Sequence, residues 1–160
     1  LRRNLLLTHL DLDEIRQELF PNPELKLLGT HQERFVVAMS YAEQAKRALA
    51  YVEQGKAVIL TGTFSRAEFK APLELLYNAL AETGIPFYAF RLAVPSDREI
   101  ERRIAKRQAE GSPSNINTLE RFKWSLEFFE PITFTRVAVV DTERPVEECA
   151  DDVYRHILGI

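Results

Sequence analysis

An α/β fold with a parallel sheet is predicted by two features of this chain. Short apolar runs of strand length alternate with longer amphipathic stretches, and several of these stretches open with a helix-capping signal. The chain has 160 residues, 46% of them hydrophobic, which is enough for one well-buried domain and too little for two. We therefore expect a single domain over residues 1–160, with ligands bound at the carboxyl ends of its parallel strands.

Four runs have the length and composition of buried strands. They are rich in the apolar residues that suit a sheet covered on both faces. In chain order these runs are Leu5 to Leu10, Ala57 to Thr61, Phe87 to Val94 and Arg136 to Val140.

Helical patterns separate all of these strands. Thr30 with Glu33 and Ser65 with Glu68 have the spacing of capping boxes, and the patterns that follow them stop near glycines. Further helices are expected over about 96–111 and 117–130, and after Pro145, which stands where a first helical residue belongs.

Charge and composition narrow the class of protein. A formal net charge of -3 argues against a general basic surface, so a nucleic-acid partner is not implied by charge, although a local basic stripe can still bind phosphates.

The single cysteine, Cys149, excludes an internal disulfide and fits a reducing compartment. No apolar run approaches a membrane span, so we expect a soluble, cytoplasmic protein. The three histidines lack metal-ligand spacing, so no metal site is predicted from them.

Three acidic residues follow the first strand, where a parallel sheet delivers side chains to its active edge: Asp11, Asp13 and Glu14. They are candidates for catalysis. The same spacing also suits a purely structural role, because Asp11 and Glu14 fit an N-cap and its partner. Likewise, Asp13 and Arg16 form an ordinary i,i+3 pair.

Basic residues crowd the helix that begins near Ser96: Arg98, Arg102, Arg103, Lys106 and Arg107. Residues four apart, such as Arg103 and Arg107, share one face, and repulsion between them must be offset. Neighbouring carboxylates can offset it and make this a solvated face. The alternative is a phosphate ligand, for which guanidinium groups are well suited.

The strand followed by Asp13-x-x-Arg16, together with Arg103-x-x-Lys-Arg107, resembles the P-loop NTPase kinases with an AAA-type ATP-binding domain. In particular it resembles 5′-hydroxyl polynucleotide kinases and zeta-toxin-type kinases. The resemblance implies a three-layer α/β/α sheet and a lid over about residues 97–117. It also implies that Asp13 is the catalytic base, that Arg16 binds the acceptor, and that Arg103 and Arg107 clamp the phosphates of ATP.

The segment Val58 to Phe64 resembles a family strand that carries a carboxylate, and here it departs from the pattern. Thr61 and Gly62 stand at the two positions where the carboxylate is expected, so a Mg²⁺-associated or arginine-orienting group is missing. Thr63 can still present a hydroxyl to the substrate, and Lys70 stands where relatives often carry arginine.

The last strand resembles the adenine-side strand of the family. By this resemblance Asp141 contacts the nucleotide, and it fits a turn or capping residue equally well. The Gly-rich phosphate loop of these kinases occurs nowhere in the 160 residues. We therefore expect the chain to be incomplete at its N-terminus, without the first, central strand of the sheet.

The function predicted from these features is an ATP-dependent phosphotransferase acting on a hydroxyl acceptor, with ATP and Mg²⁺ as cofactors. The acceptor can be a nucleic-acid 5′-end, a nucleotide sugar or a small metabolite. The alternative is a catalytically impaired domain of the same fold that binds a nucleotide or a partner, as the missing carboxylate and phosphate loop suggest.

Overall fold

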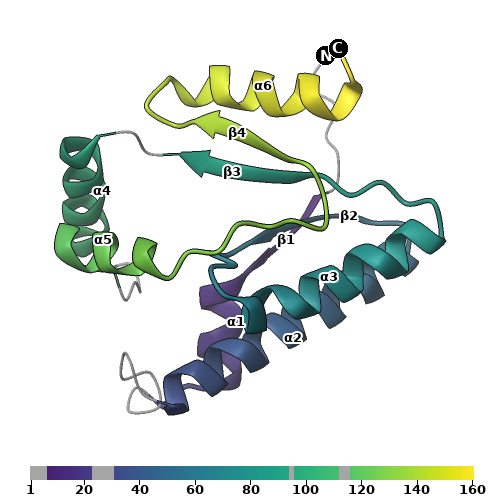
Figure 1. Cartoon of the computed structure of the whole chain (residues 1–160), viewed down its shortest axis with the longest axis horizontal. Helices are drawn as coiled ribbons and strands as arrows, with labels where there is room; N and C mark the ends of the chain where they lie inside the picture. Colours follow the sequence, from purple (N-terminus) through teal and green to yellow (C-terminus); the bar gives the residue numbers. More distant parts are fainter. Residues whose placement is uncertain (1–6, 23–30, 94–95, 112–115) are drawn as a thin grey trace. The chain divides into compact units, whose positions relative to one another are not determined.

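The computed structural model describes residues 7–22, 31–93, 96–111 and 116–160, which fall into two compact units. The N-terminal unit is Leu1–Ile85 and the C-terminal unit is Pro86–Ile160. Both have the same order of elements along the chain: strand, helix, helix, strand, helix (Figure 1). Each unit is described below by itself.

The N-terminal unit consists of β1 (Leu7–Asp11), α1 (Leu12–Leu19), α2 (His31–Glu53), β2 (Ala57–Thr61) and α3 (Ala67–Glu82). Its two strands are adjacent and parallel, with a register that runs from Leu7 opposite Ala57 to Asp11 opposite Thr61. The predicted pairing of these strands is therefore confirmed. Their carboxyl ends meet at one edge, which places the residues that follow them near each other.

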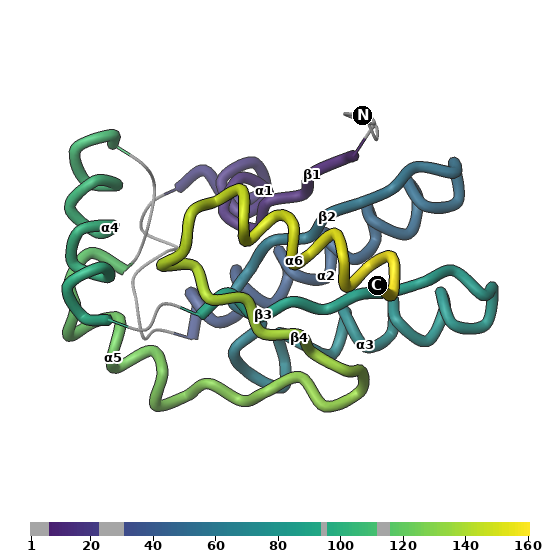
Figure 2. The backbone as a smooth tube through the Cα atoms, turned by 90° about the horizontal axis from the view of Figure 1, so that it is seen from above, coloured from purple at the N-terminus to yellow at the C-terminus, as the bar shows by residue number. Residues whose placement is uncertain are grey.

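Helix α2 is the centre of the N-terminal unit. It packs against both strands and both other helices, and Figure 2 shows it running beside α3. Its buried face carries residues at helical spacing: Val36, Val37, Ser40, Tyr41, Gln44 and Ala48. Gln44 is almost completely buried, and its amide nitrogen donates to the carbonyls of Leu10 at 2.8 Å and Thr61 at 2.9 Å. One side chain thus fixes the helix to the ends of both strands.

An ion-pair network joins α1 to α2 at the surface. The Arg47 guanidinium binds both carboxylate oxygens of Glu18 at 2.8 Å, and its Nε donates to Glu43 at 2.9 Å. The hydrogen bond from Arg47 lowers the pKa of the Glu18 carboxyl below its ordinary value. A bidentate pair of this kind also fixes orientation, because both nitrogens must face the carboxylate.

The C-terminal unit consists of β3 (Ala89–Ala93), α4 (Asp97–Ala109), α5 (Leu119–Glu127), β4 (Val137–Asp141) and α6 (Val146–Leu158). Its strands are also parallel, with Ala89 opposite Val137 and Ala93 opposite Asp141. Helix α6 packs against β4, and α4 lies beside α5 (Figure 2). The helices expected over about 96–111 and 117–130 are present as α4 and α5, and their N-caps, Ser96 and Thr118, accept hydrogen bonds from the amides three residues on.

Two predicted helix starts have a different outcome. The capping box at Ser65 is wrong, because α3 begins at Ala67 with Arg66 at the N-cap and no side-chain cap. The Glu68 carboxylate instead binds the Arg34 guanidinium of α2 at 2.5 Å, a charge-assisted contact that is stronger than a bond to a neutral amide. The box at Thr30 lies outside the described residues.

The described strands form two separate two-stranded parallel sheets. The parallel α/β arrangement is confirmed, while the three-layer sheet remains a prediction. One face of each pair is open within its own unit, since Ile59 on β2 is 43% exposed and Leu92 on β3 is 66% exposed. Across the described ranges, no helix has both the length and the apolar character needed to cross a membrane.

We expect Gln44→Met to destabilise the protein by on the order of 1–3 kcal/mol for each carbonyl that loses its donor, because methionine fills the same space without an N–H group. Urea denaturation with circular dichroism measures this loss. The control is Gln54→Met, which changes an exposed glutamine in the turn after α2. Equal stabilities of the two variants would show that the amide of Gln44 contributes nothing.

Candidate functional site

The acidic segment after β1 forms the first turn of α1. Asp11 is its N-cap, and its Oδ1 accepts hydrogen bonds from the amides of Asp13 at 2.9 Å and Glu14 at 3.2 Å. Asp13 then binds the Arg16 guanidinium at 2.7 Å. The structure thus contains both the N-cap expected at Asp11 and the i,i+3 pair expected between Asp13 and Arg16. A carboxylate in the first turn is also stabilised by the positive end of the helix dipole.

The two members of the Asp13–Arg16 pair differ in exposure. The Arg16 side chain is only 9% exposed, whereas the Asp13 side chain is 43% exposed. Among the described residues, the buried Nε of Arg16 has no hydrogen-bond partner. A buried guanidinium N–H without an acceptor costs free energy. The pair therefore offers an accessible base beside a fixed donor.

A second group of polar side chains joins the ends of β1 and β2. The Thr61 hydroxyl donates to Asp11 Oδ2 at 2.7 Å, and His9 Nε2 lies 3.0 Å from the same hydroxyl oxygen. Because the Thr61 proton goes to the carboxylate, His9 Nε2 carries the hydrogen and donates. Thr61 stands at one of the positions where a carboxylate was expected, and Asp11 brings a carboxylate to this place from the neighbouring strand. Both Asp11 oxygens already accept hydrogen bonds.

Thr63 lies just beyond β2 and is exposed, in agreement with its predicted position at the strand end. Its Oγ1 is 3.1 Å from the hydroxyl of Tyr41 on α2. Burial raises the pKa of the Tyr41 phenol, and the nearby Asp13 charge adds to this effect. Asp13, Tyr41 and Thr63 are thus grouped at the carboxyl end of the sheet. Lys70 lies in the first turn of α3 and is partly buried.

Tyr41 is the residue of this group that the sequence analysis missed. A tyrosine in a helical pattern is typical of packing, and Tyr41 is indeed 1% exposed. The available signal was its position on the buried stripe of α2, three residues before Gln44. A polar atom on such a stripe needs a partner, which spacing alone does not identify.

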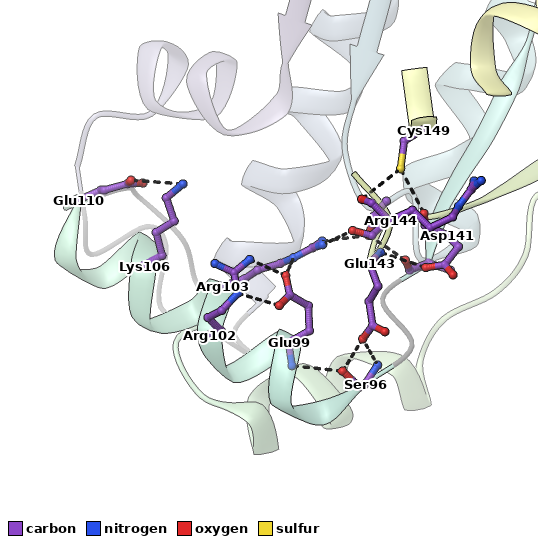
Figure 3. A network of polar contacts seen from close by, with 12 residues as sticks. Ser96, Glu99, Arg102, Arg103, Lys106, Glu110, Asp141, Glu143, Arg144 and Cys149 are labelled. Carbon is purple, nitrogen blue, oxygen red and sulfur yellow. Dashed lines mark hydrogen bonds and ion pairs between the residues drawn. The ribbon is translucent and has the colours of Figure 1, made fainter. Parts of the chain in front are cut away.

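Arg103 of the C-terminal unit is fully engaged in hydrogen bonds (Figure 3). Its Nε donates to Glu99 at 2.7 Å, while its two terminal nitrogens donate to the Thr142 hydroxyl at 2.9 Å and the Thr142 carbonyl at 2.5 Å. Thr142 in turn donates through its amide and hydroxyl to the carbonyl of Ala93. Arg103 therefore ties α4 to the turn that follows β4.

Arg107 and Asp141 differ from Arg103 in their surroundings. Arg107 is exposed in the last turn of α4, where the negative end of the helix dipole favours a cation. Asp141 ends β4, and its Oδ1 accepts from the Glu143 amide at 3.0 Å. The turn role considered for Asp141 is thus confirmed, and its carbonyl accepts from the Cys149 thiol (Figure 3). The predicted lid includes residues 112–115, which lie outside the described residues.

In the part of the chain that the structure describes, no group of three or more acidic, histidine or cysteine side chains could hold a metal ion. Mg²⁺ therefore has no matching ligand set among these residues. A nucleotide phosphate needs cationic donors, and the exposed Arg107 provides one.

Comparison with known proteins gives one family. A family model described as "AAA domain" matches residues 1–132. No curated protein matches the chain.

The Glu99 carboxyl provides a test of the network around α4. Hydrogen bonds from Arg102 and Arg103 lower its pKa from 4.5 to about 2. A lowered pKa in the folded state stabilises the protein above pH 4.5, and this contribution is lost as the pH falls from 4.5 toward 2. We expect the stability difference between the wild type and Glu99→Gln to shrink over this interval, as measured by urea denaturation at a series of pH values. The same difference should be smaller throughout in an Arg102→Gln, Arg103→Gln background; a constant difference would contradict the pairing.

Proposed function

The chain belongs to the AAA domain family of P-loop NTPase-like proteins, and from this premise we propose that it forms the acceptor-binding part of an ATP-dependent kinase. The observation that carries the proposal is the Asp13–Arg16 pair at the carboxyl end of β1. In parallel α/β sheets, ligands bind at this end of the strands. The Asp13 carboxylate is partly exposed, so a hydroxyl acceptor can reach it, and the buried Arg16 guanidinium fixes its position. A purely structural ion pair does not need an accessible carboxylate.

The proposed reaction assigns a separate role to each member of the pair. Asp13 accepts the proton of the acceptor hydroxyl as its oxygen attacks the γ-phosphorus, and the bond from that phosphorus to the β,γ-bridging oxygen breaks. Arg16 keeps its bond to Asp13 and, as the resemblance implies, binds the acceptor. Thr63 and Lys70 complete the acceptor side. The acceptor is a nucleic-acid 5′-end, a nucleotide sugar or a small metabolite with a hydroxyl group.

Of the two arginines expected to bind the phosphates of ATP, Arg103 and Arg107, we assign this role to Arg107. Arg107 is exposed, whereas all three nitrogens of Arg103 are engaged with Glu99 and Thr142. These bonds hold the Arg103 guanidinium against the turn after β4. Arg103 and Asp141 instead support the turn after β4, which by resemblance faces the adenine of ATP. No step is assigned to Mg²⁺, since the described residues offer no ligand set for it.

The single-domain prediction is part of this proposal. An isolated two-stranded sheet is only marginally stable, and the strand pair described in each unit has an open apolar face. This favours a single domain over residues 1–160, as the sequence predicts.

A binding domain without catalysis is the second candidate. It is favoured by the engaged state of Arg103 and by the absence of a carboxylate at Thr61 and Gly62. ATP binding without phosphate transfer to any hydroxyl acceptor, across 5′-hydroxyl oligonucleotides, nucleotide sugars and small polyols, would support this candidate over the kinase.

Asp13→Asn in the full-length protein should lower phosphoryl transfer by about 10²–10⁴-fold, because the amide keeps the shape of the carboxylate but cannot accept a proton. ATP affinity should stay unchanged in the same protein, as measured by calorimetry. The control is Glu14→Gln, which neutralises the adjacent carboxyl in the same helical turn. If Asp13→Asn turns over as fast as the wild type, Asp13 is only a first-turn helix acid.

Arg107→Ala should raise the activation barrier of the transfer by about 2–4 kcal/mol, through lost stabilisation of charge on the transferring phosphoryl group. Single-turnover kinetics with saturating ATP measure this loss. The matched control is Arg102→Ala, which removes an exposed arginine of the same helix that pairs with Glu99. Equal rates for the two variants would assign Arg107 to the solvated face of α4.

A further inference from the structure

Tyr41 reaches from the middle of α2 to the turn that follows β2. Its hydroxyl oxygen accepts a hydrogen bond from the Phe64 amide at 2.8 Å and lies 3.1 Å from Thr63 Oγ1. Its ring packs against the rings of Phe64 and Phe69, with centroid distances of 4.8 Å and 5.4 Å. The tyrosine therefore holds both the backbone and a side chain of this turn.

The backbone of the turn is strained at the point that Tyr41 holds. Phe64 has a φ of 43°. Among the described residues, no other non-glycine residue has a positive φ. For a bulky residue this conformation is an outlier, and such outliers persist only where surrounding contacts enforce them. Here the enforcing contacts are the hydrogen bond from the Phe64 amide and the packing of the Phe64 ring against the Tyr41 ring, which is tilted by 44° to it.

The direction of the Tyr41–Thr63 hydrogen bond follows from burial. Tyr41 is 1% exposed, and its raised pKa keeps the phenol protonated. The Phe64 amide already donates to the phenol oxygen, so the phenol proton needs an acceptor of its own, and Thr63 Oγ1 is in reach. The proton of the Thr63 hydroxyl is then free to point away from Tyr41. Since Thr63 is exposed, this proton is available to a bound molecule.

Tyr41 also accounts for the glycine at position 62. A Cβ atom on Gly62 would lie 3.0 Å from Cε1 and 3.2 Å from the hydroxyl oxygen of Tyr41, which is closer than ordinary packing allows. A side chain at position 62 would therefore require the Tyr41 ring to shift by a few tenths of an ångström. The hydroxyl at position 61 is bound to Asp11. Of Thr61, Gly62 and Thr63, at the end of β2 and directly after it, Thr63 is the residue whose hydroxyl proton can point to a bound molecule.

We propose that Tyr41 is a positioning residue that orients the Thr63 hydroxyl as a hydrogen-bond donor to an oxygen of the phosphate acceptor. This inference rests on the proposed kinase function. Thr63 touches the acceptor, while Tyr41 acts only through Thr63. Thr63 supplies a neutral donor next to positions 61 and 62, where a carboxylate was expected. The group bound here is therefore an electron-rich oxygen, as in a polyol or a phosphorylated alcohol, and not an ammonium group.

The test uses the full-length protein, ATP and the best acceptor from a panel of polyols, phosphorylated alcohols and amino alcohols. Tyr41→Phe and Thr63→Val should each raise the KM for the acceptor about three- to tenfold, as expected for one hydrogen bond, and leave the KM for ATP unchanged. The double variant should be no worse than Thr63→Val, because both changes act through one hydroxyl. Thr63→Ser should retain the wild-type KM. The control is Tyr51→Phe on the same helix.

Each outcome bears on one part of the proposal. Because Thr63 is exposed, Thr63→Val provides a well-folded test even if Tyr41→Phe loses stability. A wild-type KM in Thr63→Val, or effects of the two changes that multiply in the double variant, would overturn the positioning role. Preference for amino alcohols would overturn the assignment of an oxygen ligand. If the wild type transfers phosphate to no acceptor, the kinase function fails, and this inference fails with it.

Discussion

The amide of Gln44 is the contact on which the arrangement of the N-terminal unit depends. By donating to the carbonyls of Leu10 and Thr61, it fixes α2 across the last residues of two neighbouring strands. The segments that follow β1 and β2 are then held in a fixed position relative to α2. Without that contact, the segments carrying Asp13 and Thr63 would share a strand end but not a defined geometry. The free energy of one buried amide is modest, yet its two bonds determine where side chains from β1, β2 and α2 converge.

The site at this edge combines satisfied and unsatisfied polar groups. Asp11 accepts three hydrogen bonds, two that cap α1 and one from the Thr61 hydroxyl, so both of its carboxylate oxygens have partners. Arg16, in contrast, is buried with an N–H that lacks an acceptor among the described residues. Stability alone would favour the first arrangement, because an unpaired buried donor costs free energy. The unsatisfied donor and the strained Phe64 are the departures that point to function at this edge.

In the C-terminal unit, the polar contacts around Arg103 are satisfied, while Nε and one terminal nitrogen of Arg121 on α5 are buried without a hydrogen-bond partner among the described residues. Arg103 uses every nitrogen of its guanidinium group within the unit, and Ser96, Glu99 and Glu143 are likewise paired (Figure 3). These bonds connect α4 to the turns after β3 and β4, which lie at the carboxyl ends of that strand pair. An arginine that was attractive as a phosphate ligand on helical spacing is here a structural link, while Arg107, one turn further along, remains exposed.

Local features were accessible from the sequence, and contacts between distant residues were not. Hydrophobic periodicity and local spacing determine the strand Ala57–Thr61 to the residue, the helix that begins after Ser96, and the Asp13–Arg16 pair, because each depends on residues within a few positions of one another. The partners of Gln44, Tyr41 and Arg103 are 34, 22 and 39 residues away. A polar side chain in a helical pattern has the same local spacing whether it faces water or a strand end. Only the folded path of the chain supplies the carbonyl, hydroxyl or carboxylate that it binds, so the tertiary structure decided which of these residues form the candidate site.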